Sequence, residues 1–193
     1  APLHMDRTNL SFIRNSHDDD AAELYSVTDG RMTADRDYIR DAFTLGGTGW
    51  IKSTVADLLK YASFYLNYGH ALGLDKNTID RMLIPRINVS DDTEYCFGLE
   101  RTVTEDMEVF FHTGSLPGVS SGFGFSFDTG KGYVMLSNTT GLDSTLLLKE
   151  LIMTDLAGIS YDDPYFTERF AGTYVSDEDD DFSINLNYMG LTM

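Results

Sequence analysis

The chain has 193 residues, of which 42% are hydrophobic, so it is long enough to bury the core of one domain and to begin a second. Its 31 acidic and 14 basic residues give a net charge of -17, which repels a phosphate backbone and excludes nucleic acid as an expected partner. No apolar run approaches the roughly 20 residues that a membrane helix needs, so we expect no membrane segment in this sequence.

The first 45 residues are polar, and their scattered hydrophobic residues show no sustained period. This polar composition without a hydrophobic period predicts a long loop with short helices. A glycine-rich stretch at 46–49 then gives the backbone conformational freedom just before Trp50. Two interpretations of Trp50 stay open, because a tryptophan beside glycines either lines a substrate pocket or simply packs.

A helix is predicted to begin at Ser53 or Thr54, because Thr54 and Asp57 fit a variant capping box with Asp in place of Glu or Gln. A second short helix is expected at about 77–83 and ends before Pro85. The apolar face of the first helix consists of Val55, Leu58, Leu59, Ala62, Tyr65 and Leu66.

Beyond the second helix the hydrophobic period changes to strict alternation, which predicts four strands in a meander. They are centred on 95–99, 109–111, 123–127 and 133–135. The composition of 128–132 is typical of a hairpin turn, so the last two strands should pair antiparallel. The single cysteine, Cys96, falls in the first of these strands and predicts a packed thiol.

Residues 142–157 predict a helix, capped by Asp143 or Ser144, that lies across one face of the sheet. After Pro164 two alternating segments, 170–175 and 182–186, flank an acidic turn and predict the hairpin of a new module. The sequence therefore predicts an α+β fold in which an antiparallel sheet carries packed helices.

The tripeptide His112-Thr113-Gly114 follows the apolar run 107–111 and precedes a predicted turn at 115–121. A histidine here is either an ordinary strand residue or part of a functional site, and its Thr-Gly and Pro-Gly context favours the site. The other histidines show no metal-ligand spacing, so no metal or cofactor is expected.

Three groups of residues together carry a resemblance to a known family. They are Pro2-Leu3-His4-Met5 with Thr8, Gly46-Gly47 with Ser53-Thr54 and Asp57-Leu58, and His112-Thr113-Gly114 with Pro117-Gly118-Val119-Ser120-Ser121. In order and spacing they resemble the serine β-lactamase and penicillin-binding-protein-like family, in the branch of class C β-lactamases, D-amino-acid peptidases and related esterases.

The resemblance implies two domains. Residues 1–160 would form the C-terminal portion of a β-lactamase-like catalytic domain, with part of a β-lactamase/transpeptidase-like fold. Residues 161–193 would form a linker and the first hairpin of a truncated β-barrel-like domain, because the tail resembles the opening of the small barrel that often follows this catalytic domain. Members of the family are often extracytoplasmic, but the sequence assigns no localisation.

In this family a serine in a Ser-x-x-Lys motif attacks a carbonyl carbon, and a Lys-Thr-Gly-like strand completes the acyl-transfer site. The resemblance places His112 at the lysine position of that strand, where it would support substrate binding and proton transfer. It makes the Ser115 N–H one of two oxyanion donors. Thr113 and Gly114 would bind a small-molecule or peptide acyl substrate.

The chain also departs from the family pattern, because no serine in it is followed by lysine three positions on. The letters Tyr65-Leu66-Asn67 match the Tyr-x-Asn motif, but side chains two apart on a helix point in nearly opposite directions, so we interpret this match as a decoy. We expect the nucleophilic serine and its lysine in a missing N-terminal part of the same catalytic domain, and this chain alone to be inactive.

Two functional hypotheses follow from these residues. The first is a portion of a serine acyl hydrolase of the β-lactamase, D-amino peptidase or esterase type, which supplies the third-motif strand and an oxyanion donor. The second is a noncatalytic binding or scaffold module that keeps the β-lactamase-like fold without its chemistry.

Overall fold

The computed structural model describes residues 2–10, 18–28, 31–34, 49, 51–103, 107–139, 172–175 and 181–184. The chain divides into two compact units, Ala1–Lys149 and Glu150–Met193, and each is described by itself. The helix expected at 142–157 and the domain boundary expected after residue 160 lie outside the described residues, so both stay predictions.

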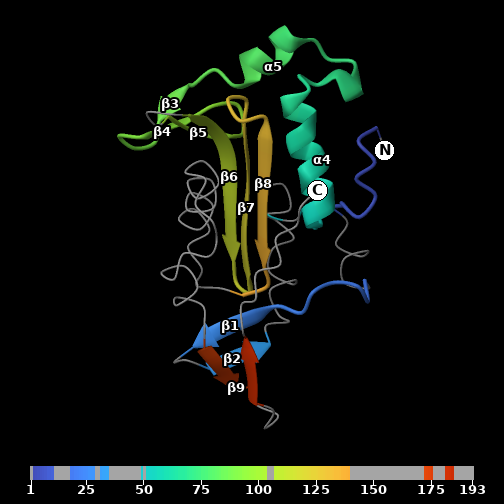
Figure 1. Ribbon diagram of the computed structural model, residues 1–193, viewed down its shortest axis with the longest axis vertical. Helices are drawn as coiled ribbons and strands as arrows, with labels where there is room; N and C mark the ends of the chain where they lie inside the picture. The colour runs from blue at the N-terminus through green and yellow to red at the C-terminus, as the bar shows by residue number, and fades with distance from the viewer. Residues whose placement is uncertain are drawn as a thin grey trace. The chain divides into compact units, whose positions relative to one another are not determined.

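A six-stranded antiparallel sheet, with its strands in the order of the sequence, forms the body of the first unit. Figure 1 shows that its last three strands are long and that helix α4 lies alongside β8. The predicted antiparallel meander is therefore confirmed for the strands centred on 109–111, 123–127 and 133–135, and three further strands precede them. The strands are β3 (Ile87–Asn88), β4 (Thr93–Tyr95), β5 (Glu100–Val103), β6 (Glu108–Leu116), β7 (Val119–Ser126) and β8 (Lys131–Ser137).

Helix α4 (Val55–Leu66) begins at the predicted Thr54 cap, because the Thr54 side chain accepts a hydrogen bond from the Asp57 backbone N–H at 3.2 Å. The reciprocal half of the capping box is not formed, because the Asp57 carboxylate binds Arg7, Thr8 and Lys60 instead. The predicted apolar face is only partly right. Val55 and Leu59 are 44% and 41% exposed, since the helix turns the side of Ala62 and Tyr65 towards the sheet.

The core lies between α4 and the long strands and is rich in aromatic rings. The Tyr65 ring stacks on that of Phe125 with 4.8 Å between centroids, and Phe125 also stacks on Phe110 at 5.6 Å. Phe125 is fully buried, which confirms the interpretation of this strand as sheet core. The helix approaches β8 closely at Gly132, where an added Cβ would stand 2.7 Å from the Ala62 Cβ.

A buried carboxylate ties the N-terminal segment to α4. The side chain of Asp57 accepts hydrogen bonds from the Arg7 backbone N–H and the Thr8 hydroxyl, both at 2.9 Å. It also accepts one from Lys60 Nζ at 2.8 Å, and Asp57 is only 2% exposed. Since Arg7 and Thr8 lie about fifty positions before Asp57 in the sequence, their hydrogen bonds hold residues 2–10 against the helix.

The strand predicted at 95–99 is wrong, because β4 ends at Tyr95 and residues 96–99 form the turn to β5. The Cys96 N–H donates to the Leu99 carbonyl at 2.7 Å, and Gly98 has a φ of 84°, which favours glycine. The alternation misled the prediction because Phe97, one of its apolar positions, is 70% exposed. Cys96 is packed as expected, its thiol donates to the Leu83 carbonyl at 3.1 Å, and burial raises its pKa.

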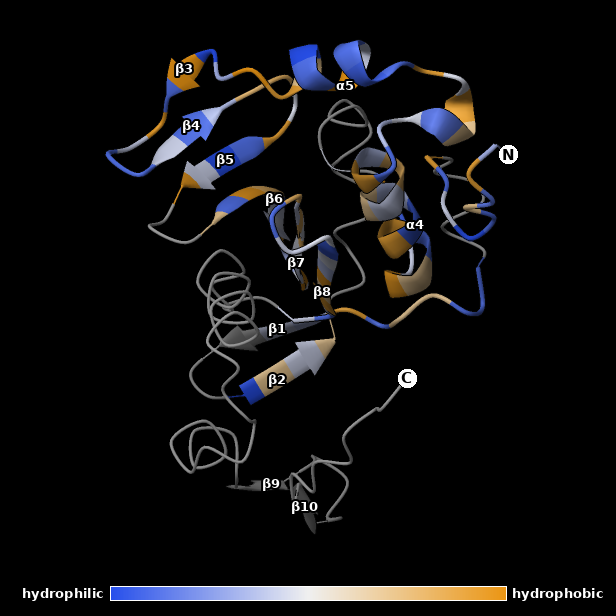
Figure 2. Ribbon diagram, turned by 45° about the horizontal axis from the view of Figure 1, so that its top comes forward, coloured by the Kyte–Doolittle hydropathy of each residue, from blue (hydrophilic) through white to orange (hydrophobic). Residues whose placement is uncertain are grey.

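Two further elements link α4 to the sheet. A short 3-10 helix, η2 (His70–Leu72), follows α4, and α5 (Lys76–Met82) begins at the Asp75 cap. The second helix is thus confirmed within one residue. Figure 2 shows that the strands β4 and β5 are largely hydrophilic.

The N-terminal region predicted as a loop contains a hairpin of β1 (Tyr25–Thr28) and β2 (Arg31–Ala34). Each strand has four residues, too few for a period to be recognised, and all four β2 residues are exposed. The Tyr25 N–H donates to the Asn138 carbonyl at 2.8 Å, which fixes this hairpin beside the end of β8.

The second unit contains the antiparallel pair β9 (Gly172–Val175) and β10 (Asp181–Ile184), which confirms the predicted hairpin. Its membership of a β-barrel module stays a prediction. Within the part of the chain that the structure describes, no helix combines the length and the apolar composition needed to cross a bilayer.

The Asp57 contacts predict a pH-dependent contribution to stability. The Lys60 hydrogen bond, helped by those from Thr8 and Arg7, outweighs burial and lowers the pKa of Asp57 below its ordinary 3.8. A depressed carboxyl pKa stabilises the fold above the unfolded pKa, and this stabilisation is lost as pH falls through the folded pKa. We expect Asp57→Asn to lower the free energy of unfolding in urea by a constant amount above about pH 5, and the difference from wild type to close below pH 3.8.

Asp80→Asn is the matched control, because Asp80 forms an exposed pair with Lys76 on the surface of α5 at 2.7 Å. It should change the urea midpoint much less than Asp57→Asn at neutral pH. A difference between wild type and Asp57→Asn that stays the same at neutral and strongly acidic pH would contradict the proposed role of the carboxylate.

The close approach at Gly132 predicts a second effect on stability. Gly132→Ala should lower the free energy of unfolding by about 1–3 kcal/mol, because the new Cβ overpacks the contact with Ala62. Ala62→Gly alone should cost about 1 kcal/mol through helix propensity. The double variant should lose less than the sum of the two, since Ala62→Gly removes the Cβ with which the new Cβ at position 132 would clash. Additive losses in urea titrations would rule out this contact as the cause.

Candidate functional site

The predicted site residues occupy consecutive positions in the second half of β6. Strand β7 pairs with β6 along its length, from Phe110 opposite Phe125 to Leu116 opposite Val119. On the other side, β5 pairs with β6 only as far as Phe111, which lies opposite Glu100. Among the described strands, the segment 112–116 therefore has a neighbour on one edge only.

A tight turn sets the direction of the backbone groups on this edge. Pro117 and Gly118 form a two-residue connection, and the Gly118 φ of 77° suits the third position of a type II turn. Leu116 and Val119 flank the turn as a hydrogen-bonded pair, so alternation makes Ser115 the next, non-hydrogen-bonded position. The Ser115 N–H therefore points away from β7. The structure shows that β6 continues to Leu116, so the turn predicted at 115–121 is shorter than expected.

His112 is exposed and makes two hydrogen bonds through its ring. Its Nδ1 lies 2.7 Å from the Thr113 carbonyl oxygen, and its Nε2 lies 3.2 Å from the hydroxyl of Tyr95. The two rings meet edge to face at an interplanar angle of 83°. Tyr95, at the end of β4, is a site neighbour that the sequence reasoning missed, because its position depends on the pairing of β4, β5 and β6.

Gly114 lies opposite Ser121 of β7, and an added Cβ at Gly114 would stand 2.6 Å from the Ser121 Oγ. Glycine is therefore the residue that keeps this stretch of the strand surface open. Thr113 is half-buried one position earlier, and Ser115 is exposed one position later. The structure thus brings all four predicted site residues onto one strand, as the resemblance implied.

The end of this strand is supported by segments that are distant in the sequence. An added Cβ at Gly118 would stand 2.6 Å from the Leu24 Cβ, so the chain before β1 packs on the turn. Ser120 is fully buried, and its hydroxyl donates to the Thr139 carbonyl at 3.1 Å. Gly49 lies beside Leu116, whereas Trp50 and the rest of the glycine-rich stretch lie outside the described residues.

The second-motif match is confirmed as a decoy. Tyr65 is 2% exposed and packs in the core, while Asn67 caps the C-terminal end of α4 by donating to the Ser63 carbonyl at 2.8 Å. Among the described His, Cys, Asp and Glu residues, no three gather as metal ligands do.

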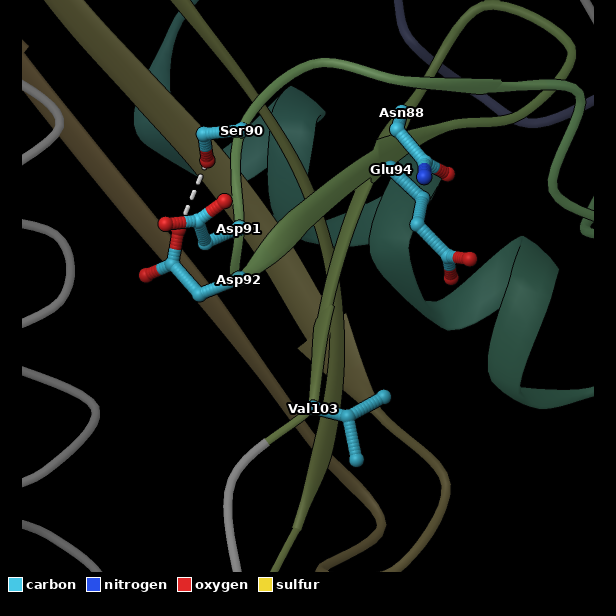
Figure 3. Close-up of a pocket in the computed structure, with 6 residues that line it drawn as sticks. All are labelled: Asn88, Ser90, Asp91, Asp92, Glu94 and Val103. Atoms are coloured by element: carbon cyan, nitrogen blue, oxygen red, sulfur yellow. Dashed lines mark hydrogen bonds between the residues drawn. The ribbon is translucent and has the colours of Figure 1, made fainter.

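A hollow of about 180 Å³ lies away from these residues, on the β3–β4 hairpin and β5 (Figure 3). Its walls are mainly polar and acidic, and the Ser90 hydroxyl donates to Asp92 at 2.7 Å across its rim. None of the four predicted site residues lines it. The lining residues are Asn88, Ser90, Asp91, Asp92, Glu94 and Val103.

The close approach of Gly114 and Ser121 predicts a small loss of stability when residue 114 is enlarged, which a smaller residue at position 121 should relieve. Gly114→Ala should lower the free energy of unfolding by about 1 kcal/mol, at the lower end for overpacking, because a serine hydroxyl can rotate away. Adding Ser121→Ala should recover most of that loss in urea or thermal unfolding. If the double variant is no more stable than Gly114→Ala, the crowding lies elsewhere.

Comparison with solved structures identifies the fold. The chain superimposes on the octameric penicillin-binding protein homologue from Pyrococcus abyssi with a TM-score of 0.72 and 20% identity, over 96% of this chain and 44% of that one. It matches a D-stereospecific amidohydrolase from Streptomyces with a TM-score of 0.65 and 19% identity, over 82% of this chain and 46% of the other.

A third solved structure is the D-amino acid amidase from Ochrobactrum anthropi in complex with D-phenylalanine. The TM-score is 0.55 and the identity 22%, over 82% of this chain and 51% of the amidase. The sequence matches no protein-family model and no curated protein. The chain spans about half or less of the length of these three proteins. Its α+β architecture is thus part of the β-lactamase/transpeptidase-like fold found in penicillin-binding protein homologues and D-amino acid amidases.

Proposed function

We propose that this chain forms one wall of the acyl-transfer site of a serine hydrolase. The observation that carries the proposal is the position of the segment 112–115, which extends past the end of β5 on a strand of a hydrolase-like fold. A sheet edge of this kind offers backbone groups to an extended substrate.

In the proposed reaction, attack of a serine oxygen on the substrate carbonyl carbon places negative charge on the carbonyl oxygen. The Ser115 N–H would stabilise that charge, together with the N–H of the nucleophilic serine. Gly114 would let the substrate lie against the strand because it has no Cβ. The Thr113 hydroxyl would hydrogen-bond the substrate, and His112 would support binding and proton transfer as an auxiliary group.

The substrate proposed is a small-molecule or peptide acyl compound, of the β-lactam, D-amino peptide or ester type. Two of the structural neighbours are a D-stereospecific amidohydrolase and a D-amino acid amidase, which favours amides of D-amino acids for the first trials. Since no Ser-x-x-Lys occurs in the 193 residues, the nucleophile would come from sequence outside them.

The absence of Ser-x-x-Lys from this sequence favours a second candidate, a noncatalytic binding or scaffold module with the same fold. A fluorescent penicillin or a fluorophosphonate separates the two. Labelling of the intact protein, and not of this chain alone, supports the hydrolase. An intact protein that resists both probes and has no Ser-x-x-Lys upstream would leave the binding module as the function.

The oxyanion role of Ser115 is tested by removing its N–H. Ser115→Pro takes away the donor while, by the strand alternation, sparing the pairing with β7, so we expect the rate of D-phenylalanine amide hydrolysis by the intact protein to fall about 100- to 1000-fold. Ser115→Ala keeps the N–H and should lose far less. Circular dichroism and thermal unfolding check that the proline variant folds, and equal losses in the two variants would contradict a backbone donor.

A further inference from the structure

We propose that Tyr95 is a positioning residue for His112, and that its hydroxyl holds the imidazole in the tautomer that carries its proton on Nδ1. The contact between Tyr95 and His112 follows from the geometry alone, whereas its role in catalysis rests on the proposed function. Neither the sequence motifs nor the family resemblance drew attention to Tyr95 as a site residue.

The hydrogen bonds around the ring assign the protons. The Thr113 carbonyl oxygen, 2.7 Å from Nδ1, can only accept, so Nδ1 carries a hydrogen. In the neutral ring Nε2 then has a lone pair, and the group facing it at 3.2 Å is the Tyr95 hydroxyl. A hydroxyl both donates and accepts, so Tyr95 donates to Nε2, and the two contacts select the same tautomer.

Tyr95 itself is held by backbone pairing on both sides. It lies opposite Ile87 of β3 and opposite Glu100 of β5, and its carbonyl accepts from the Arg86 N–H at 2.8 Å. The turn at 96–99 begins immediately after it. The backbone of Tyr95 is therefore fixed at the end of β4. The Tyr95 ring lies nearly perpendicular to the His112 ring.

A histidine at this position needs its ring held in one orientation and one tautomer, whereas a lysine there would not. A lysine ammonium is a donor in every rotamer, whereas an imidazole has two different nitrogens that exchange roles with the tautomer. His112 is exposed, so a lone side chain there would sample several rotamers and both tautomers. With Tyr95 and the Thr113 carbonyl on either side, both ring nitrogens have a protein partner, so the imidazole is held in one orientation and one tautomer.

The test is a ¹⁵N spectrum of the histidine rings in the intact protein, at a pH where the ring is neutral. His112→Asn identifies the His112 signals. We expect wild type to show a protonated Nδ1, and a non-protonated Nε2 whose resonance is displaced upfield by the accepted hydrogen bond. Tyr95→Phe should lose that displacement and gain the tautomer protonated on Nε2.

Tyr68→Phe is the control, because Tyr68 stacks on Phe127 away from His112 and the phenylalanine keeps that ring. It should leave the His112 signals in place. A proton on Nε2 in wild type, or His112 resonances that do not change in Tyr95→Phe, would overturn the proposal.

Catalytic measurements separate this proposal from the proposed function. In an active protein, Tyr95→Phe should lower kcat several-fold more than it raises KM, because the imidazole of His112 is no longer held in one orientation and tautomer. If the intact protein proves not to be a hydrolase, the proposed function fails while the ring spectrum still decides the role of Tyr95. If Ser115→Pro abolishes activity and Tyr95→Phe changes neither kcat nor the spectrum, the role of Tyr95 alone is refuted.

Discussion

The antiparallel pairing of β6 with β7 is the constraint on which both the core and the candidate site depend. One register places Phe110 opposite Phe125 in the core and Gly114 opposite Ser121 near the exposed end. A slip of one residue would reverse every side chain between the two faces of the sheet, removing an aromatic ring from the core and a glycine from the edge. The fully buried Phe125, stacked on Tyr65 of α4, fixes the register of β6 against β7. The same register sets the positions of the candidate site residues on β6.

The short β4–β5 hairpin explains why, among the described strands, the second half of β6 has a neighbour on one edge only. Its turn, with Gly98 in the left-handed region, places Tyr95 opposite Glu100 and Glu100 opposite Phe111, so pairing with β6 ends there. Tyr95 is thus aligned with Phe111, one position before His112, and its hydroxyl reaches the His112 ring. One turn therefore creates the edge and supplies its neighbouring hydroxyl, and a longer hairpin would have covered the segment that carries the motif.

The sequence predicted those parts of the fold whose causes are local. The Thr54 cap of α4 and the β7–β8 hairpin depend on residues a few positions apart, and both were identified. Alternation fails at 95–99 because the burial of Cys96 and the exposure of Phe97 depend on how this turn packs against the core, and not on the two faces of a strand. The motif residues could be placed on a strand, but the open edge and the Tyr95 contact arise from pairing between separate strands.

Two paired cations among the described residues bear on what the proposed site could recognise. Arg101, which the register places beside β6, pairs with both Glu94 and Glu108, and Lys60 is bound to Asp57. Neither cation is therefore available to a substrate without breaking its own contacts. In the Nδ1-protonated tautomer proposed for His112, the ring adds no positive charge to the hydrogen-bonding groups of the segment 112–115. Within the proposed function, such a wall suits a neutral amide or ester better than a substrate that must be held by its carboxylate, because a carboxylate transferred from water needs a charged partner as well as donors.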